Sequence, residues 1–406
     1  MCADRVTASS LRTRLAAAAR RIDHAAGRTL TRLRVLVDVR TPMNVAVLRP
    51  VWSALATDPR ITLAFTAEQS QPVRTALMSD GLADALIPRS SATWTRWDLV
   101  LTADAWNHTP LRRCHRRLQF FHGVAGKYDL DAPERMRAAH LERFDRVAFI
   151  NEDRMRRYVN AGVVTSGQAV LVGYPKADDL INGRWSREEV RQSLRLEESR
   201  ATVLYAPTFS VAGSLHRAGP AIIGALLDAD FNVIVKLHDR SMVADARHTA
   251  GIDWPQRLRT FDASGRFVLA RGADAEPFLA AADVLVTDHS TVGFEFALLD
   301  RPIVVFDAPQ LLAAARIDRD KWDLLRSMAT VVHTPAETVS AVCAALAQPS
   351  ALSTARLGAR ALFASPGTAT QRALAIVYEL LGVAPLEMAY RRVDPPALSP
   401  LAGMGG

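Results

Sequence analysis

Four short segments of the chain combine histidine, lysine, glycine, serine and threonine at the ends of apolar runs that are typical of buried strands. They are FHGVAGK (121–127), VLYAPTFS (203–210), VIVKLHDR (233–240) and DHSTVGFE (288–295). Open α/β sheets bind ligands at the carboxyl ends of their strands, so we expect these segments to face one crevice. Hydroxyls, cations and free N–H groups at such an edge suit a phosphate group.

The first segment offers a candidate general base, His122. A histidine beside glycine at a strand end can present its imidazole to a cleft, and its ordinary pKa lies near neutral pH. The alternative is an interior histidine whose hydrogen bonds are satisfied. Gly123 and Gly126 would let the backbone approach a ligand, or would simply form turns.

The second and third segments offer groups that could bind an anion. Thr208 could donate to a phosphate, although Pro-Thr is also common in turns. We expect Lys236 and His238 to lie on one face of a strand over 232–237, with Arg240 near them. A buried lysine at a strand end needs an anion or a hydrogen-bonding partner, so this pair indicates a functional site.

The fourth segment lies inside a strand–turn–helix–strand unit over 282–307. Asp288, Ser290 and Thr291 follow a strand at 283–287 and precede a helix at 292–299, where they would bind a pyrophosphate or only cap the helix. Glu295 lies one helical turn further on. It would face the hydroxyls of a ribose, or it is a glutamate on the helix surface.

Composition favours a soluble globular protein of two domains, since 406 residues are long for one core. We find no secretory signal and no apolar run that could span a bilayer, and we expect a cytoplasmic protein. The three cysteines fit neither a disulfide framework nor a zinc site. The net charge is +8, with arginines gathered near the start and at 112–117. An anionic membrane face or a phosphate-rich substrate would suit this charge, and nucleic acid suits it least because no basic-aromatic motif is present.

Strands alternate with helices through both halves of the chain, which is typical of βαβ units. We expect two Rossmann-like α/β domains with parallel sheets and a cleft between them. The predicted parts are a basic amphipathic helix (1–32), an acceptor domain (33–175), a nucleotide-donor domain (176–365), a C-terminal helix that could cross back to the first domain (366–384) and a disordered tail (385–406).

Taken together and in this order, the motifs HG-x-x-x-K, LYAPTF, K-L-H and TD-x-S-T-V-x-FEFALL-x-RPIVVF resemble those of the CDP-glycerol glycerophosphotransferase family. The family contains the teichoic-acid polymerases and primases of bacterial cell-wall synthesis. The resemblance covers roughly residues 120–381. It departs from the family at three positions, where Val124, Asp239 and His289 replace a threonine, a proline and a tyrosine.

The resemblance implies a GT-B architecture and transfer of a polyol phosphate from a CDP-polyol to an acceptor hydroxyl, with release of CMP. It implies a lipid-linked or cell-surface glycan as acceptor and an anionic membrane surface as a further partner. The implied roles are acceptor activation by His122, donor phosphate binding by Lys236 and His238, and pyrophosphate binding by Ser290 and Thr291. Thr208 would line the donor site, and Glu295 would face the ribose or glycerol.

The motifs contain no clear Asp-x-Asp metal site and no cofactor motif, so we expect weak or no metal dependence. Two alternatives stay open at this point. One is a GT-B glycosyltransferase that uses a nucleotide sugar for capsule or lipopolysaccharide synthesis. The other is a non-catalytic module that binds anionic glycans or lipids, for which loss of His122 or His238 would change nothing.

Overall fold

The computed structural model describes residues 32–67, 70–78, 80–105, 110–135, 140–272 and 274–386. The expected N-terminal helix, apart from Arg32, and most of the expected tail lie outside these residues. Within the described ranges no helix is both long and apolar enough to cross a bilayer.

The first half of the chain forms a six-stranded parallel sheet in the order β2-β1-β3-β4-β5-β6. The central strands β1 and β3 are mostly buried on both faces, as is typical of parallel sheets, whereas β4 begins with exposed arginines and β6 is partly buried. The strands are β1 (Leu33–Val39), β2 (Ile61–Ala67), β3 (Arg96–Thr102), β4 (Arg113–Phe120), β5 (Arg146–Phe149) and β6 (Ala169–Leu171). The helices are α2 (Pro42–Ala56), α3 (Ser70–Met78), α4 (Arg89–Trp94) and α5 (Glu152–Asn160).

The second half forms another six-stranded parallel sheet, in the order β12-β11-β10-β7-β8-β9. The strands are β7 (Thr202–Tyr205), β8 (Asn232–Val235), β9 (Phe267–Leu269), β10 (Val284–Thr287), β11 (Ile303–Phe306) and β12 (Thr330–Val332). This is the strand order of the doubly wound nucleotide-binding fold, and its direction reverses between β7 and β10. A ligand is therefore expected at the carboxyl ends of these two strands.

Helices cover both faces of the second sheet. They are α7 (Arg187–Ser193), α8 (Ser214–Asp228), α9 (Trp254–Leu258), α10 (Glu276–Ala281), α11 (Thr291–Ala297), α12 (Gln310–Ala314), α13 (Arg319–Ser327), α14 (Pro335–Ala347) and α15 (Ser353–Gly358).

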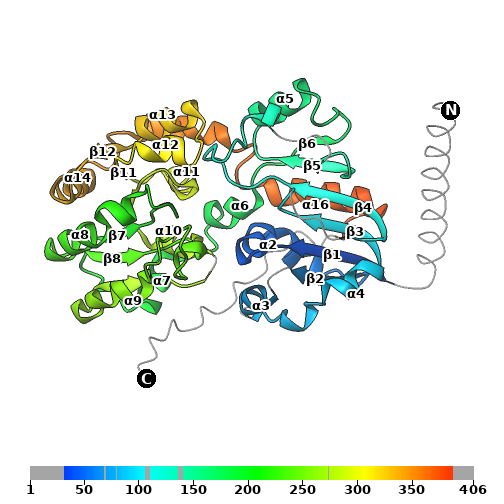
Figure 1. Cartoon of the computed structure of the whole chain (residues 1–406), viewed down its shortest axis with the longest axis horizontal. Helices are drawn as coiled ribbons and strands as arrows, with labels where there is room; N and C mark the ends of the chain where they lie inside the picture. The colour runs from blue at the N-terminus through cyan, green and yellow to red at the C-terminus, as the bar shows by residue number, and fades with distance from the viewer. Residues whose placement is uncertain are drawn as a thin grey trace.

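Two further helices join the halves, α6 (Pro175–Ile181) and α16 (Ala369–Leu381). Figure 1 shows α6 between the two lobes, and α16 lies against the sheet of the first lobe although it is the last helix of the chain. Ala177 and Leu180 of α6 belong to one buried apolar cluster that extends from α2 to α10 and α11. The two halves thus share part of their core.

The structure corrects two predicted elements. The sequence of 134–143 predicts a helix, but its described part has a 3-10 turn (Pro133–Arg135) and a turn at 141–143 instead. There the Gln168 side chain donates to the Leu141 and Phe144 carbonyls, which fixes a non-helical path. The expected strand over 232–237 ends at Val235.

Candidate functional site

His122 lies at the carboxyl edge of the first sheet, two residues after β4. Two charged residues lie at the ends of other strands of this sheet. Arg40 follows β1 and Asp104 follows β3, and their side chains form an ion pair of 2.9 Å. Burial lowers the pKa of His122, while Asp104 and a hydrogen bond to the backbone of Ala103 act in the opposite direction. A lowered pKa keeps the imidazole neutral at neutral pH. The bond to Ala103 occupies one ring nitrogen as a donor and leaves the other able to accept a proton.

The loop that carries His122 is anchored by a buried arginine, Arg154 of α5. Its Nε donates to Asp131 Oδ1 at 2.6 Å, and its Nη1 donates to the Gly123 carbonyl at 3.0 Å. Gly123 has a φ of +80°, and a Cβ there would lie 3.7 Å from Thr291 Oγ1. The backbone next to His122 therefore already touches the second half of the molecule.

On the opposite side, Asp288 organises the loop that follows β7. Its Oδ1 accepts the Thr208 N–H at 2.9 Å, and its Oδ2 accepts the N–H and the hydroxyl of Ser214 at 2.9 and 3.0 Å. Only 1% of Asp288 is exposed, so its hydrogen bonds explain why a carboxylate is tolerated there. Asp288 shapes this edge of the sheet rather than projecting from it.

Ser290 and Thr291 stand at the start of α11, at the reversal point between β7 and β10. Both are partly exposed, and the Ser290 side chain makes no capping hydrogen bond to the helix. His289 before them is buried, lies stacked on Trp322 at 5.4 Å between ring centroids, and its Nε2 lies 2.9 Å from the Ala125 carbonyl. The sequence therefore correctly predicts a polar turn at this edge.

Lys236 and His238 are both present at this edge, but not as neighbours on one strand. Because β8 ends at Val235, the two residues belong to a loop. Lys236 Nζ donates to the Leu237 carbonyl at 3.0 Å, and burial lowers its pKa. His238 Nδ1 accepts the Arg240 N–H at 3.1 Å. Burial and the neighbouring cations Lys236 and Arg240 lower the pKa of His238 to about 3.

This bond fixes the tautomer of His238. A neutral imidazole whose Nδ1 accepts must carry its proton on Nε2, so Nε2–H is a donor. The ring lies 4.2 Å from that of Phe209, between centroids. His238 can thus donate a hydrogen bond to an anion without carrying a charge.

Glu295 is buried in α11, with its Oε2 at 2.8 Å from Lys176 Nζ. Its Oε1 has a longer contact of 3.5 Å with the Tyr174 hydroxyl. The possibility that Glu295 is a surface glutamate is therefore wrong, since 3% of the residue is exposed. The other predicted residues lie in loops or at a helix start that follow strands of the two sheets. The expected donation from Thr208 to a phosphate is not available in this structure, because its hydroxyl is buried and donates to the His289 carbonyl at 2.6 Å.

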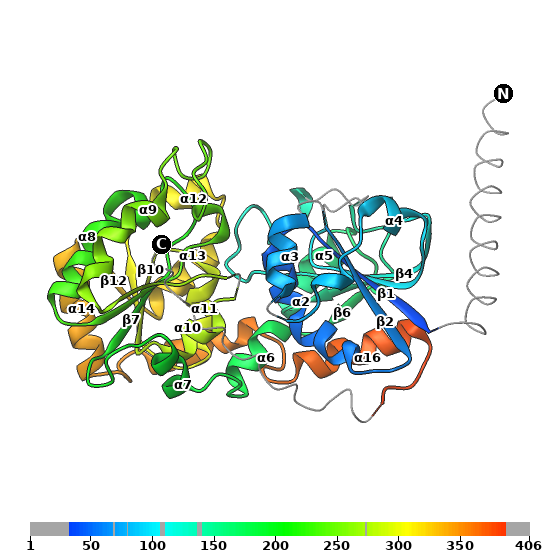
Figure 2. The ribbon, with the colours of Figure 1, turned by 90° about the horizontal axis from the view of Figure 1, so that it is seen from below.

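The loop after β4 crosses to the second half and is bound there by backbone as well as side chains (Figure 2). The Asp318 N–H donates to the Gly126 carbonyl at 2.8 Å, and the Tyr128 N–H donates to the Ala315 carbonyl at 2.8 Å. Lys127 Nζ donates to Thr208 Oγ1 at 2.8 Å. No role was assigned to Lys127 from the sequence, although it is the lysine of the HG-x-x-x-K motif.

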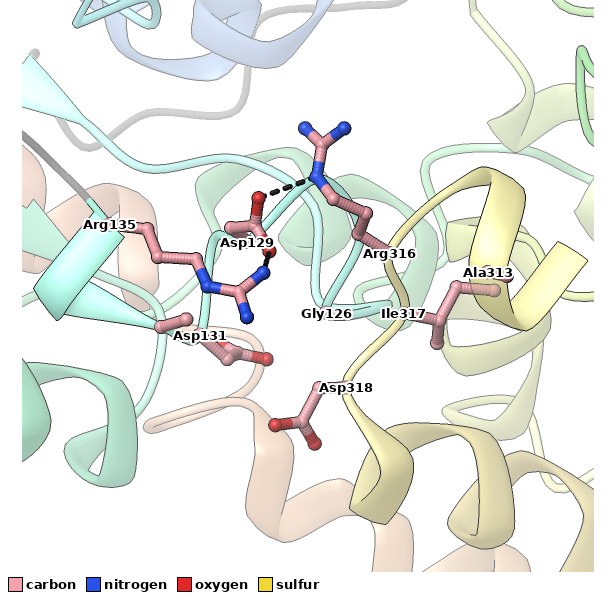
Figure 3. Close-up of a pocket in the computed structure, with 9 residues that line it drawn as sticks. Gly126, Asp129, Asp131, Arg135, Ala313, Arg316, Ile317 and Asp318 are labelled. Atoms are coloured by element: carbon pink, nitrogen blue, oxygen red, sulfur yellow. Dashed lines mark hydrogen bonds and ion pairs between the residues drawn. The ribbon is translucent and has the colours of Figure 1, made fainter.

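We call the contact between segments 126–135 of the first half and 313–318 of the second half the seam. A cavity of about 310 Å³ lies there. Figure 3 shows Asp129 between two arginines, one from each half. Asp129 accepts from Arg135 Nη1 at 2.7 Å and from Arg316 Nε at 2.5 Å. The other two lining carboxylates pair with arginines of α5, Asp131 with Arg154 and Asp318 with Arg157. Across the described ranges, no three His, Cys, Asp or Glu side chains gather as a metal site would require.

Comparison with known proteins gives a consistent result. The sequence profile described as CDP-Glycerol:Poly(glycerophosphate) glycerophosphotransferase matches residues 99–312. A teichoic acid poly(glycerol phosphate) polymerase of Staphylococcus epidermidis is 24% identical over 227 residues. That alignment covers 54% of this chain and 29% of the relative, so less than a third of the relative's length is matched.

Solved structures with the same fold include enzymes of two kinds. The wall teichoic acid polymerase TagF superposes with a TM-score of 0.60 at 13% identity, over 86% of this chain and 89% of the other. A UDP-N-acetylglucosamine 2-epimerase superposes with a TM-score of 0.55 at 16% identity, over 90% and 99% of the two chains. At these identities the likeness shows the fold, and it confirms the expected GT-B-like architecture.

Proposed function

Because this chain belongs to the CDP-glycerol:poly(glycerophosphate) glycerophosphotransferase family, we propose that it transfers a polyol phosphate from a CDP-activated donor to an acceptor hydroxyl. The polyol is glycerol or a similar one, and the acceptor is a lipid-linked or cell-surface glycan. The observation that carries the proposal is a contact between the carboxyl edges of the two sheets. The half-buried His122 belongs to a loop that both halves hold, and a Cβ on Gly123 beside it would lie 3.7 Å from Thr291 Oγ1, at the reversal point of the second sheet.

The proposed reaction is an in-line displacement at the β-phosphorus of the donor. The acceptor oxygen forms a bond to that phosphorus, the bond to the CMP phosphate breaks, and His122 takes the proton of the acceptor hydroxyl. No covalent intermediate on the protein is needed. Positioning and stabilisation of negative charge therefore supply the rate enhancement.

The donor residues have the hydrogen-bonding capacity for this role. The Ser290 hydroxyl does not cap α11, and the Nε2–H of His238 has no hydrogen-bond partner among the residues that the structure describes. Lys236 adds a positive charge, and Thr291 lies beside Gly123. Glu295 is the candidate for ribose or glycerol hydroxyls, because Lys176 holds one of its oxygens and leaves the other with one long contact.

Binding of the donor can be tested before an acceptor is known. We would measure the melting temperature with CDP-glycerol, CDP-ribitol and a UDP-sugar in parallel, because a ligand that binds only the folded state raises it. Stabilisation by the CDP-polyols alone supports the proposal. Stabilisation by the UDP-sugar alone indicates a glycosyltransferase, and no response to any of them indicates a non-catalytic module.

Turnover is then tested by CMP release with glycan or lipid-linked acceptors. The variant His122→Ala should bind the CDP-polyol as well as the unchanged protein does and release CMP at least about 100-fold more slowly, as for loss of a general base. Near-full CMP release by a folded His122→Ala protein would show that the base is another group.

We also propose that the protein attaches to an anionic membrane through the amino edge of its first sheet. Trp94 is 64% exposed there, and the Arg112 guanidinium lies 4.7 Å from its ring centroid. Arg113 and Arg116 at the start of β4 are also exposed, and Arg116 forms an ion pair of 2.6 Å with Asp145. Aromatic rings with flanking cations suit the headgroup region of a bilayer with negative charge.

A further inference from the structure

Lys127 reaches from the loop after β4 in the first half to the reversal point of the second sheet. Its Nζ donates to Thr208 Oγ1 at 2.8 Å. The Thr208 hydroxyl donates its own hydrogen bond to the His289 carbonyl at 2.6 Å, so its oxygen is the acceptor for the lysine. The contact joins residues 81 positions apart and fixes the ammonium at the carboxyl end of β7.

The Lys127 ammonium has no carboxylate partner among the residues that the structure describes. The nearest candidate is Asp288, whose charge raises the pKa of Lys127, but both Asp288 oxygens already accept hydrogen bonds from Thr208 and Ser214. Burial outweighs this effect and lowers the pKa of Lys127 to about 8. An ammonium group has three donors, and a single acceptor uses one of them. A desolvated cation with unused donors is a receptor for an anion.

The surroundings of this cation are those of the proposed donor site. Lys127 contributes to the lowered pKa values of both His238 and His289, so it lies within electrostatic range of the two imidazoles. The pKa of His238 is lowered to about 3 and that of His289 to about 4. They are neutral at pH 7 and do not neutralise an anion. The positive charge for a diphosphate must come from other side chains, of which Lys127, Lys236 and Arg240 all act on the His238 imidazole.

We propose that Lys127 binds the diphosphate of the donor, so that the anion is held by cations from both halves of the protein. This inference rests on the proposed function for the identity of the donor. Lys236 supplies the cation from the second half, and Lys127 supplies the one from the first. An anion bound between them bridges the halves at the point where Lys127 now contacts Thr208.

A consequence follows for the acceptor side. Lys127 and His122 belong to the same short loop, and Arg154 and the backbone bond from Asp318 to Gly126 hold its two ends. A diphosphate bound by Lys127 therefore fixes the loop that presents the imidazole. Donor binding should precede productive binding of the acceptor.

The test measures binding, not turnover, by titration calorimetry of the full chain with two probes, CDP-glycerol and inorganic pyrophosphate. At pH 7.5, Lys127→Met should weaken the affinity for both probes by about tenfold or more, as for loss of a charged hydrogen bond. Lys127→Arg keeps a positive charge and should stay within about threefold of the unchanged protein. Circular dichroism checks that each variant is folded.

The pH dependence gives a second readout that a purely structural lysine would not produce. The protonated ammonium is the tighter-binding form, so the affinity for CDP-glycerol should fall by about four- to eightfold from pH 7.5 to pH 9, as expected for a pKa near 8. The CDP-glycerol diphosphate does not titrate in this range. In Lys127→Arg the affinity should no longer fall between pH 7.5 and pH 9. A pH dependence of the affinity that persists in this variant is assigned to Lys236.

The outcomes separate this inference from the proposed function. Unchanged affinity of Lys127→Met for both probes, or an unchanged pH profile in Lys127→Arg, overturns the role of Lys127. Binding of pyrophosphate but not CDP-glycerol, with loss in Lys127→Met, keeps Lys127 as an anion ligand and rejects the proposed donor. If the unchanged protein binds neither probe, both proposals are wrong.

Discussion

The Lys176 ammonium lies 2.8 Å from the Glu295 carboxylate, and this ion pair joins α6 to α11 where 4% of either side chain is exposed. Taking two charges out of water is costly, and their attraction compensates for that cost only while both are present. The pair lies beside the helix that connects the two halves. A single substitution here would leave one buried charge alone.

We predict that Lys176→Met lowers the free energy of unfolding by about 3–5 kcal/mol, because Glu295 becomes an uncompensated buried carboxylate. Urea denaturation followed by circular dichroism measures this change. The matched control is the double variant Lys176→Met/Glu295→Leu, which removes both charges and should recover most of the loss. Equal destabilisation of the single and double variants would mean that packing, not charge, makes Lys176 important.

The strands of both sheets could be predicted from the sequence because their signal is local. A parallel strand is buried on both faces, so it is a short apolar run between polar residues, as in 202–205 and 303–306. The structure has β7 and β11 at these same residues. The polar turns at strand ends could also be predicted from the local sequence. For this reason the turns that contain His122, Thr208 and 288–291 were placed correctly after their strands.

Contacts between distant parts of the chain could not be predicted in this way. From the sequence alone, the segment that forms α6 is predicted to be a polar connector, because lysine and aspartate, as at 176 and 178, are usually found on the surface. Both are buried, Lys176 against Glu295 and Asp178 as the acceptor for the N–H groups of Gly367 and Thr370 at 2.8 and 2.6 Å. Such partners lie more than 100 positions away. The contact of Lys127 with Thr208 was missed for the same reason.

His289 should make the stability of the protein depend on pH. Burial and Lys127 lower its pKa from 6.5 to about 4. Between these values the unfolded chain binds a proton that the folded protein does not, so stability present above pH 6.5 is lost as the pH falls toward 4. The expected contribution of His289 is a loss of about 2 kcal/mol between pH 7 and pH 5.

The variant His289→Gln tests this dependence, since glutamine does not titrate and keeps an N–H donor for the Ala125 carbonyl. Urea denaturation at pH 7 and pH 5 should show a difference between the two pH values that is smaller by about 2 kcal/mol in the variant. An equal pH dependence in both proteins would assign the effect to other groups.

Gly126→Ala should disrupt the seam between the halves. Gly126 has a φ of +61°, and a Cβ there would lie 2.8 Å from both Asp131 Oδ2 and Asp318 Cβ. Strain and clash should together lower the free energy of unfolding by about 2–4 kcal/mol and weaken donor binding. Gly162→Ala is the control, because Gly162 has a similar φ of +67° and no atom within 4 Å of a Cβ. Gly162→Ala should lower the free energy of unfolding by about 1 kcal/mol, from backbone strain alone.

A melting-temperature measurement compares the two glycine variants directly. The seam explanation requires a clearly larger drop for Gly126→Ala than for Gly162→Ala. Equal drops would show that the positive φ accounts for the whole effect and that the loop can shift away from Asp318 without cost.

The amino edge of the first sheet should bind vesicles that contain anionic phospholipid. Trp94→Ala/Arg112→Glu removes the exposed ring and reverses one charge, and each basic group near such a surface contributes about 1 kcal/mol. Binding to phosphatidylglycerol vesicles in a sedimentation assay should therefore fall by at least about tenfold. Neither side chain touches the proposed donor site, so affinity for CDP-glycerol should not change.

Val243→Ser is a suitable control, because Val243 is an exposed apolar side chain, at 68%, in the second half of the molecule. It should leave vesicle binding as it is. The charge component can be separated from the aromatic one by raising the salt concentration, which screens arginines but not the burial of Trp94. If the double variant and the control bind phosphatidylglycerol vesicles equally well, this edge is not the membrane-facing surface.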